Sequence, residues 1–203
     1  MTPQITRDSW PVVLRTCPAF DMSDDQFFAF CQQNRNWRIE RTAEGELIIM
    51  PPVGWDTGDQ NASITAFLKI WSIQDKSGIA VDSSTGFILP NRATRSPDAA
   101  WVRKSRLRAF TPAQRKKFLP LCPDFVIELR SPSDTLKTLQ AKMQEYLDNG
   151  AQLGWLIDPS ERHVYIYRPG VAMEYLDNPT TISGDPELPG FVLDLTPIWE
   201  AGL

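Results

Sequence analysis

The feature that most constrains the fold is an apolar run with a single acid inside it. Residues 123–129 read Pro-Asp-Phe-Val-Ile-Glu-Leu, which is typical of a central strand covered on both faces. Glu128 stands within this run, and a carboxylate in apolar surroundings loses several kcal/mol of hydration free energy unless a cation or strong donors compensate. Three partners for Glu128 remain open: a bound metal ion, Arg130, or a lysine of the following helix.

Strand geometry indicates where a second carboxylate must come from. Asp124 and Glu128 share a face of the predicted strand, but at about 3.3 Å per residue they lie about 13 Å apart and cannot bind one ion. A second ligand must therefore belong to a neighbouring strand. Asp98, which follows Pro97 and opens a predicted strand over residues 98–102, is the candidate.

A helix is predicted after the central strand, over residues 135–149. We expect the Ser-Pro-Ser-Asp sequence of residues 131–134 to cap it and Gly150 to close it. Lys142 lies at the border of the helix's apolar stripe, so it can lay its alkyl chain along the core and direct its ammonium toward the sheet. A solvated surface lysine is the alternative. The stripe itself, at about 100° per residue, is formed by Leu136, Leu139, Met143, Tyr146 and Leu147.

The remaining periodicities predict an α/β (α+β) fold, with a central mixed sheet flanked by helices and additional β-hairpins. Further helices are expected at residues 23–34, where Ser23 is the cap, at 57–75 and, as a brief basic helix, at 111–119. The tail from residue 170 to 203 is expected to contain two short strands. The other predicted strands are 37–41, 47–50, 79–82, 86–89, 153–157 and 164–167.

Composition and missing motifs exclude several classes of protein. No apolar stretch approaches the roughly 18 residues of a membrane span, and the first residues lack the apolar run of a secretory signal. We therefore expect a cytoplasmic protein without a membrane partner.

The single histidine, His163, alternates with apolar residues of a predicted strand, which indicates a structural role. This argues against serine-triad, Cys-His and His-rich zinc enzymes, because each needs a catalytic or metal-binding histidine. Because the sequence lacks both a Gly-x-x-x-x-Gly-Lys loop and a Gly-x-Gly-x-x-Gly turn, no nucleotide cofactor is expected.

The charge is distributed unevenly along the chain. The net charge is −4, yet the segment from Arg92 to Lys117 carries nine basic residues and one acid, a local charge of +8 against −12 for the remainder. A basic segment of this kind suits phosphate binding, and a solvated charged face is the plainer interpretation.

These motifs, in this order, resemble the Uma-type restriction endonuclease family, which is abundant in cyanobacteria and belongs to the PD-(D/E)XK nuclease superfamily. The resemblance extends from about residue 39 to residue 191, and its most specific part lies between residues 97 and 159. The residues that carry it are Pro97-Asp98, then Pro-Asp-Phe-Val-Ile-Glu-Leu-Arg-Ser-Pro-Ser-Asp at 123–134, then Lys142-x-x-Glu145-Tyr146-Leu147-x-x-Gly150, then Trp-Leu-Ile-Asp-Pro at 155–159.

The resemblance implies a metal-dependent nuclease site. Asp98 and Glu128 match the two acidic positions and would bind Mg²⁺ or Mn²⁺, with the backbone carbonyl of Leu129 as a further ligand. Glu40 would complete the acidic cluster, directly or through water. The superfamily lysine expected two residues after Glu128 is replaced by an arginine here; families of this type recruit a lysine from the following helix. Lys142 stands at that position, and Arg130 is its rival.

The resemblance also implies DNA as the partner and a homodimer in which two sites cut two strands. Nucleic-acid contacts are expected from basic residues near the site: Arg92, Arg95, Arg103, Lys104 and Arg130. We expect one restriction-endonuclease-like domain over residues 1–203, with an N-terminal docking segment and helix at 1–36, the nuclease core at 37–168 and C-terminal strands at 169–203. The alternative is a catalytically inactive nuclease-fold protein that binds nucleic acid or a protein partner.

Overall fold

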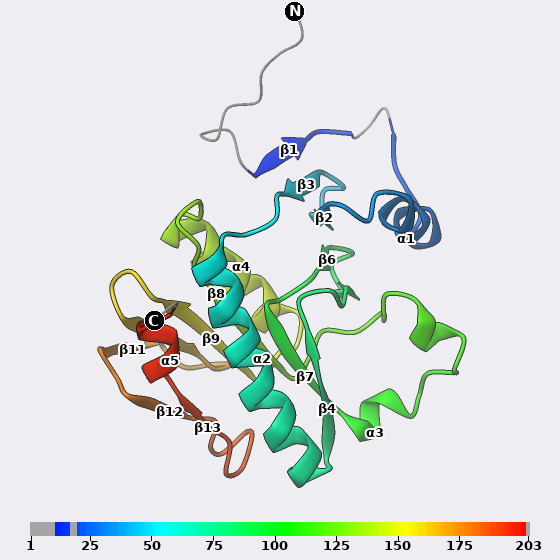
Figure 1. The fold of residues 1–203 in the computed structure, drawn as a ribbon. Coiled ribbons are helices and arrows are strands. Elements are labelled where there is room, and N and C mark those ends of the chain that lie inside the picture. Colours follow the sequence, from blue (N-terminus) through cyan, green and yellow to red (C-terminus); the bar gives the residue numbers. More distant parts are fainter. Residues whose placement is uncertain (1–10, 17–19, 202–203) are drawn as a thin grey trace, which may run out of the picture.

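The fold is built around a mixed six-stranded sheet. The computed structural model describes residues 11–16 and 20–201, and its strands form this sheet, a five-stranded sheet and a two-stranded one (Figure 1). Within the six-stranded sheet only β8 (Phe125–Leu129) and β9 (Leu153–Asp158) run parallel, and the other neighbours are antiparallel. The predicted mixed sheet is confirmed. Its strands are, in spatial order, β11 (Glu174–Asp177), β10 (His163–Tyr167), β9 (Leu153–Asp158), β8 (Phe125–Leu129), β7 (Ala99–Arg103) and β4 (Gly78–Asp82).

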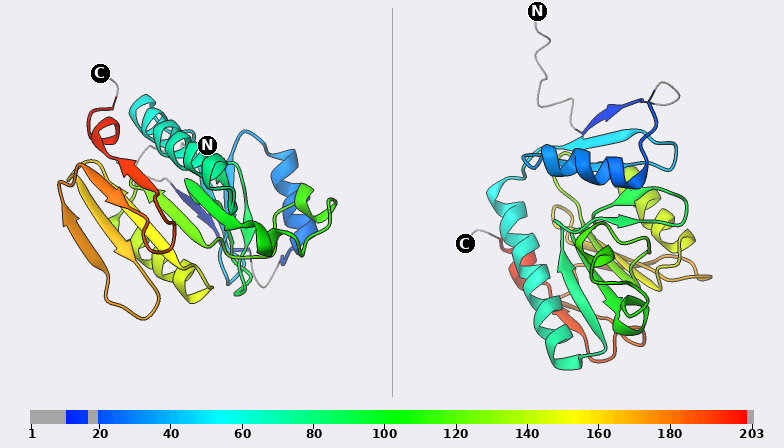
Figure 2. Two further views of the ribbon diagram at one scale, coloured as in Figure 1. Left: turned by 90° about the horizontal axis from the view of Figure 1, so that it is seen from below. Right: turned by 90° about the vertical axis from the view of Figure 1, so that its right-hand side faces the viewer.

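Helices cover both faces of this sheet, as the apolar central strand requires (Figure 2). The face of β8 that carries Phe125 and Ile127 packs on α2 (Trp55–Asp75) and on the C-terminal elements. The opposite face, which carries Val126, packs on α4 (Leu136–Asp148). Glu128 shares this second face because side chains alternate along a strand, so its carboxylate points toward α4.

Strand pairing places the two predicted metal ligands side by side. In the antiparallel register of β7 and β8, Ala99 lies opposite Ile127. Asp98 precedes Ala99 by one residue and Glu128 follows Ile127 by one, so the two acids meet at the same edge of the sheet. Asp98, the expected second carboxylate, therefore lies beside Glu128, and its role as a metal ligand stays a prediction.

The second sheet forms a separate layer above the first. Its core is a predicted hairpin of β2 (Arg38–Arg41) and β3 (Leu47–Met50), and helix α1 (Asp24–Gln33) packs on it through Phe27. Helix α1 begins with the expected capping box, in which Ser23 and Gln26 each accept a hydrogen bond from the other's backbone N–H. In spatial order the strands are β1 (Val12–Leu14), β3 (Leu47–Met50), β2 (Arg38–Arg41), β6 (Thr94–Arg95) and β5 (Phe87–Ile88).

Two predicted elements in the basic segment and the tail differ from the structure. The helix expected at 111–119 is wrong: only a 3-10 turn, η2 (Gln114–Lys116), forms there, because three consecutive cations leave no apolar face to pack. A short helix, α3 (Lys104–Leu107), forms earlier instead. The tail holds three strands rather than two, followed by α5 (Thr196–Trp199); its other strands are β12 (Thr181–Ser183) and β13 (Val192–Asp194).

The cap of α4 also differs from the prediction. Thr135 is the N-cap and accepts a hydrogen bond from the Thr138 N–H. Residues 131–134 form a turn of their own, in which the Asp134 carboxylate accepts hydrogen bonds from the Ser131 N–H and hydroxyl at 3.0 and 2.6 Å. The turn therefore stands between β8 and α4 as a separate wall, which becomes important for the pocket described below.

None of the helices within residues 11–16 and 20–201 is both long and apolar enough to cross a membrane.

Candidate functional site

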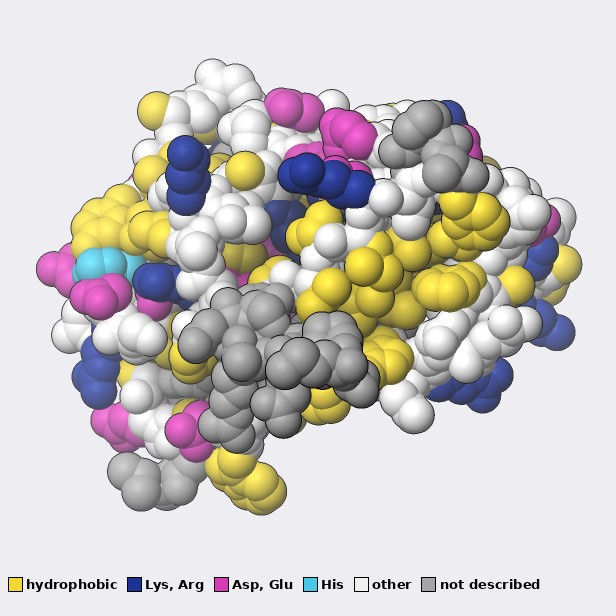
Figure 3. All heavy atoms as spheres, turned by 90° about the horizontal axis from the view of Figure 1, so that it is seen from above, with side chains coloured by type: hydrophobic (Ala, Val, Ile, Leu, Met, Phe, Trp, Pro, Cys, Tyr) yellow, Lys and Arg dark blue, Asp and Glu magenta, His cyan; other side chains and the backbone are white. Residues whose placement is uncertain are grey.

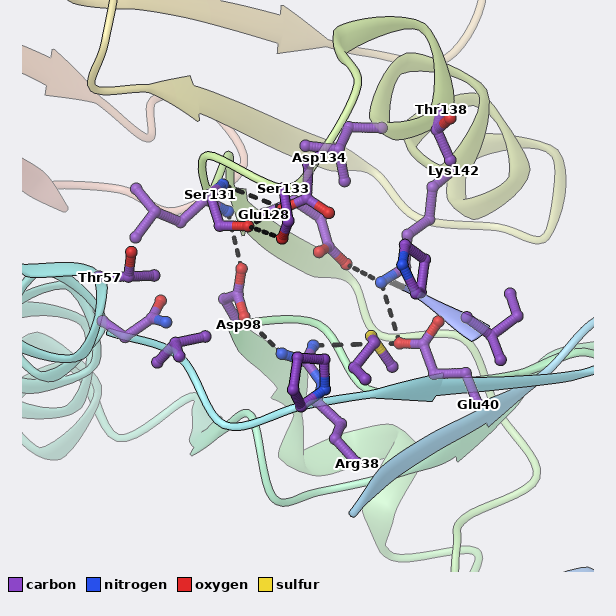
Figure 4. A pocket seen from close by; sticks show the side chains of 18 of the residues that line it. Arg38, Glu40, Thr57, Asp98, Glu128, Ser131, Ser133, Asp134, Thr138 and Lys142 are labelled. Atoms are coloured by element: carbon purple, nitrogen blue, oxygen red, sulfur yellow. Dashed lines mark hydrogen bonds and ion pairs between the residues drawn. The ribbon is translucent and has the colours of Figure 1, made fainter. Parts of the chain in front are cut away.

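The predicted acids lie at the floor of a pocket of about 600 Å³. Figure 4 shows the walls: β2 and β3 lie on one side, the first turns of α2 on a second, and α4 with the 131–134 turn on a third. Asp98 and Glu128 are 6% and 2% exposed, so both carboxylates are reached only through this pocket.

Glu128 is held from α4 by two side chains. The Lys142 ammonium lies 2.9 Å from Oε1 of Glu128, and the Tyr146 hydroxyl donates to the same oxygen at 2.9 Å. Burial raises the pKa of Glu128 to about 7, because the ammonium only partly offsets desolvation and the nearby carboxylates. Of the two rivals, the structure brings Lys142 to Glu128, while Arg130 pairs with Asp158 at 2.5 Å.

Asp98 is fixed through both of its oxygens. Oδ2 accepts a hydrogen bond from the Leu129 N–H at 2.8 Å, which ties the ends of β7 and β8 together. Oδ1 accepts from Nη1 of Arg38 at 2.9 Å, and a second nitrogen of Arg38 donates to the Ser96 carbonyl. Although burial favours the neutral form, the facing carboxylates raise the pKa of Arg38, so it stays a cation.

Glu40 reaches the site from β2 and is surrounded by donors. Its carboxylate lies 2.9 Å from the Lys142 ammonium, 3.2 Å from Arg95 and 2.9 Å from the Ser96 N–H. Burial alone would raise the pKa of Glu40, but Lys142, Arg95 and Arg38 together lower it to about 2. Glu40 is thus ionised at neutral pH and positions Lys142.

With every acid counted as ionised, the side chains that line the pocket have a formal net charge of −2. Three cations face five carboxylates; the cations are Arg38, Arg95 and Lys142, and the carboxylates are Glu40, Asp98, Glu128, Asp134 and Glu145. Oxygen ligands and two more carboxylates than cations suit a hard divalent cation such as Mg²⁺ or Mn²⁺.

The donor set fits such an ion through two carboxylates. Within the described ranges, no group of three or more His, Cys, Asp or Glu side chains could hold a metal together. Asp98 and Glu128 would therefore supply two ligands, and backbone carbonyl and water oxygens the rest, as is common for Mg²⁺. Glu40 is paired with Lys142 and Arg95, and its part in the acidic cluster, directly or through water, stays a prediction.

The basic residues expected to contact nucleic acid are dispersed. Arg95 is buried and bonded to Glu40 and Glu145. Arg103 and Lys104 lie at the far end of β7 from Asp98, where α3 begins (Figure 1). Arg92 is exposed, 3.8 Å from Asp21. Their role in binding nucleic acid stays a prediction.

Sequence reasoning missed two side chains of the site. Arg38 precedes Glu40 by two residues on β2, so a strand prediction already places the two on one face. Tyr146 follows Lys142 by four residues on α4, so both face the same neighbour. The Arg38 contact requires that β2 lies over the start of β7, and the Tyr146 contact requires that α4 packs on β8 at Glu128; spacing along the chain encodes neither approach.

The chain is similar to known proteins at two levels. A structure titled "putative nuclease belonging to DUF820", from Anabaena variabilis ATCC 29413, superposes with a TM-score of 0.71 over 88% of this chain and 98% of that chain, at 19% identity. At that identity the likeness establishes the fold. A search of curated proteins gives no match. The sequence model of a family described as "Putative restriction endonuclease" matches residues 24–196. The chain, matched over most of its length, therefore belongs to the Uma2 family.

Proposed function

We propose that this protein is a metal-dependent endonuclease that hydrolyses phosphodiester bonds in DNA at a PD-(D/E)XK-type site. The observation that carries the proposal is the convergence of three groups from three elements in one pocket. Asp98 directly precedes β7, Glu128 is the penultimate residue of β8, and Lys142 comes from α4 with its ammonium 2.9 Å from Glu128. Membership of the Uma2 family supports the same conclusion.

Asp98 and Glu128 are the side chains that would hold Mg²⁺ or Mn²⁺, with the Leu129 carbonyl as a further ligand. A divalent cation there would supply Lewis-acid polarisation of the phosphate and make a water molecule more acidic. The Leu129 N–H fixes Asp98, and Tyr146 fixes Oε1 of Glu128. Both ligands are therefore held in place by the protein, which reduces the reorganisation that catalysis would otherwise need.

Lys142 orients the attacking water and stabilises developing negative charge on the phosphate. Burial lowers the pKa of Lys142, but the Glu128 and Glu40 carboxylates raise it above its usual value. The ammonium therefore keeps its proton at neutral pH and acts as a donor rather than as a base. Because Glu40 holds it from the opposite side, Lys142 is positioned before substrate arrives.

Nicking of a supercoiled plasmid in Mg²⁺ or Mn²⁺ tests the proposal. The wild type should convert supercoiled to open-circular DNA, and Asp98→Asn and Glu128→Gln should each lose this activity at least about 100-fold. Asp177→Asn, an exposed carboxylate on β11, is the control and should nick like the wild type. If no metal supports either nicking of the plasmid or cleavage of single-stranded DNA, the inactive nuclease-fold protein becomes the better description.

A further inference from the structure

We propose that the pocket takes a single unpaired nucleotide, so that the substrate is single-stranded DNA or a duplex with an extruded base rather than an intact duplex. This inference rests on the proposed nuclease function and names the form of DNA that the same site accepts. Four features support it: the depth of the pocket, its apolar wall, an exposed tryptophan next to a lining residue in the chain, and an amide oxygen without a partner among the residues that the structure describes.

The depth of the pocket limits what can reach its floor. The carboxylates that would bind the cation are 6% and 2% exposed, and the space above them is about 600 Å³. That volume is within the roughly 300–1,000 Å³ of pockets that enclose small ligands. A phosphodiester bond in a stacked duplex is flanked by its own strand and by the complementary one. Only a strand that leaves the duplex can enter such a space.

The wall opposite the charged floor is apolar. Met50 ends β3, and the first three of the four residues between β3 and α2, Pro51, Pro52 and Val53, all line the pocket. Val53 is 52% exposed, so its side chain is available to a ligand. On the face seen from above, hydrophobic side chains gather beside a group of basic and acidic ones (Figure 3). A phosphate backbone gains nothing from such a wall, whereas the face of a base does.

An exposed tryptophan is the direct chain neighbour of the pocket lining. Trp55 opens α2 directly after Gly54, a residue that lines the pocket, and it is 82% exposed. Trp101, by contrast, is 2% exposed and belongs to the core. Base stacking on an exposed aromatic is how many proteins hold unpaired strands without selecting a sequence.

An amide in the pocket offers hydrogen bonds to a base edge. Asn61 lies on α2 and lines the pocket, and its Oδ1 is buried with no hydrogen-bond partner among the residues that the structure describes. Leaving a buried acceptor unsatisfied costs about 1–3 kcal/mol, which a base donor would recover. The pocket thus combines a charged floor for a phosphate, an apolar wall for a base and an amide for its edge.

The test compares three oligonucleotides of one sequence: a single strand, a blunt duplex, and a duplex with one unpaired 2-aminopurine. Cleavage is measured with Mn²⁺, and binding by fluorescence anisotropy with Ca²⁺ in its place. The wild type should bind and cut the single strand and the unpaired site at least about tenfold better than the blunt duplex. The 2-aminopurine emission should change on binding, because the base moves from the helix into the pocket.

Two pocket variants and one matched control sharpen the result. Trp55→Ala and Val53→Ser should each weaken single-strand binding about tenfold. Val192→Ser is the control, because Val192 on β13 is also 52% exposed; it should bind like the wild type. All three substitutions are at exposed positions, so circular dichroism should show unchanged folding.

The outcomes separate the inference from the function on which it rests. If the blunt duplex is bound and cut as well as the single strand, or if the control weakens binding as much as the pocket variants, the inference is wrong and the nuclease function stands. If no form of DNA is bound or cut, both are wrong. Preference for unpaired DNA would also make a symmetric pair of sites unnecessary, since one site cuts one strand.

Discussion

The two ends of strand β8 carry the same chemical group in different surroundings. At one end, Asp124 accepts a hydrogen bond from the Arg103 N–H at 2.9 Å and pairs with Arg106 at 3.2 Å. At the other, Glu128 pairs with Lys142 at 2.9 Å at the floor of a pocket. Both carboxylates are more than nine-tenths buried and share one face of the strand.

The difference lies in how each charge is balanced. Asp124 is one carboxylate facing two arginines that are 49% and 37% exposed, so its charge is more than balanced and the arginines remain hydrated. Glu128 belongs to a pocket in which five carboxylates face three cations. Burial and an ion pair alone therefore do not mark a functional acid. The unbalanced charge beside an open space distinguishes the site from a structural ion pair.

The largest expected effect is on stability at the Glu128 end. Lys142→Met leaves two buried carboxylates, Glu40 and Glu128, without their shared cation, and we expect it to lower the free energy of unfolding by about 3–5 kcal/mol at pH 7. Arg106→Met at the Asp124 end should lower it by less than about 1 kcal/mol, because that arginine is hydrated and Arg103 remains. Urea unfolding of both variants measures the two losses of unfolding free energy. Equal losses would contradict the proposed difference between the two ends of β8.

The next effect concerns pH. Glu40 has a folded-state pKa of about 2 against 4.5 for the free side chain, so its ionised form stabilises the fold above about pH 4.5 and this contribution is lost as the pH falls toward 2. We expect the difference in unfolding free energy between wild type and Glu40→Gln to shrink by on the order of 3 kcal/mol between pH 7 and pH 2.

Urea titrations at several pH values check this sign. A difference between wild type and Glu40→Gln that stays constant over the whole range would show that the surrounding cations do not stabilise the Glu40 charge.

A smaller effect is expected from the hydroxyl on α4. Tyr146→Phe removes the donor that lies 2.9 Å from Glu128 and keeps the ring, so we expect a loss of about 1–2 kcal/mol in unfolding free energy. Tyr165→Phe on β10 is a matched control on the same face of the sheet, away from the pocket lining. Thermal unfolding of the two variants measures the difference. An equal fall in melting temperature in both would show that the Tyr146 hydroxyl has no special role in holding Glu128.

The smallest effect concerns the basic residues at the far end of β7. If Arg103 contacts phosphate, Arg103→Gln should weaken DNA binding and reduce the slope of log affinity against log salt by about 1. The measurement is fluorescence anisotropy over a range of salt concentrations. An unchanged slope would show that Arg103 contacts Asp124 but not phosphate, so the Asp124 end of β8 would have a structural role alone.

The sequence was most informative where a pattern fixed both an element and a face. The apolar run around Glu128 predicted a covered strand, and strand spacing required a second acid on a neighbouring strand, where Asp98 is found. The stripe on α4 placed Lys142 at its border, and the structure turns that border toward Glu128. Each of these inferences depends on local geometry with a fixed period.

Contacts between distant layers were not accessible in this way. Arg38 meets Asp98 only because the second sheet folds over the first, and no spacing along the chain encodes that approach. Arg103 is five residues from Asp98 and was expected near the site, but a strand carries it about 16 Å away. Residues close in sequence can therefore lie far apart when a strand separates them, and residues far apart in the chain can meet across the pocket.

The most direct test of the account is calorimetric titration of Mn²⁺ into three proteins that differ at the two ends of β8. The wild type should bind one ion, Glu128→Gln should bind it at least about tenfold more weakly, and Asp124→Asn should bind it like the wild type. Each variant keeps the shape of the side chain and removes one buried charge. Equal affinity in the wild type and Glu128→Gln, or a loss confined to Asp124→Asn, would contradict the assignment of the metal site.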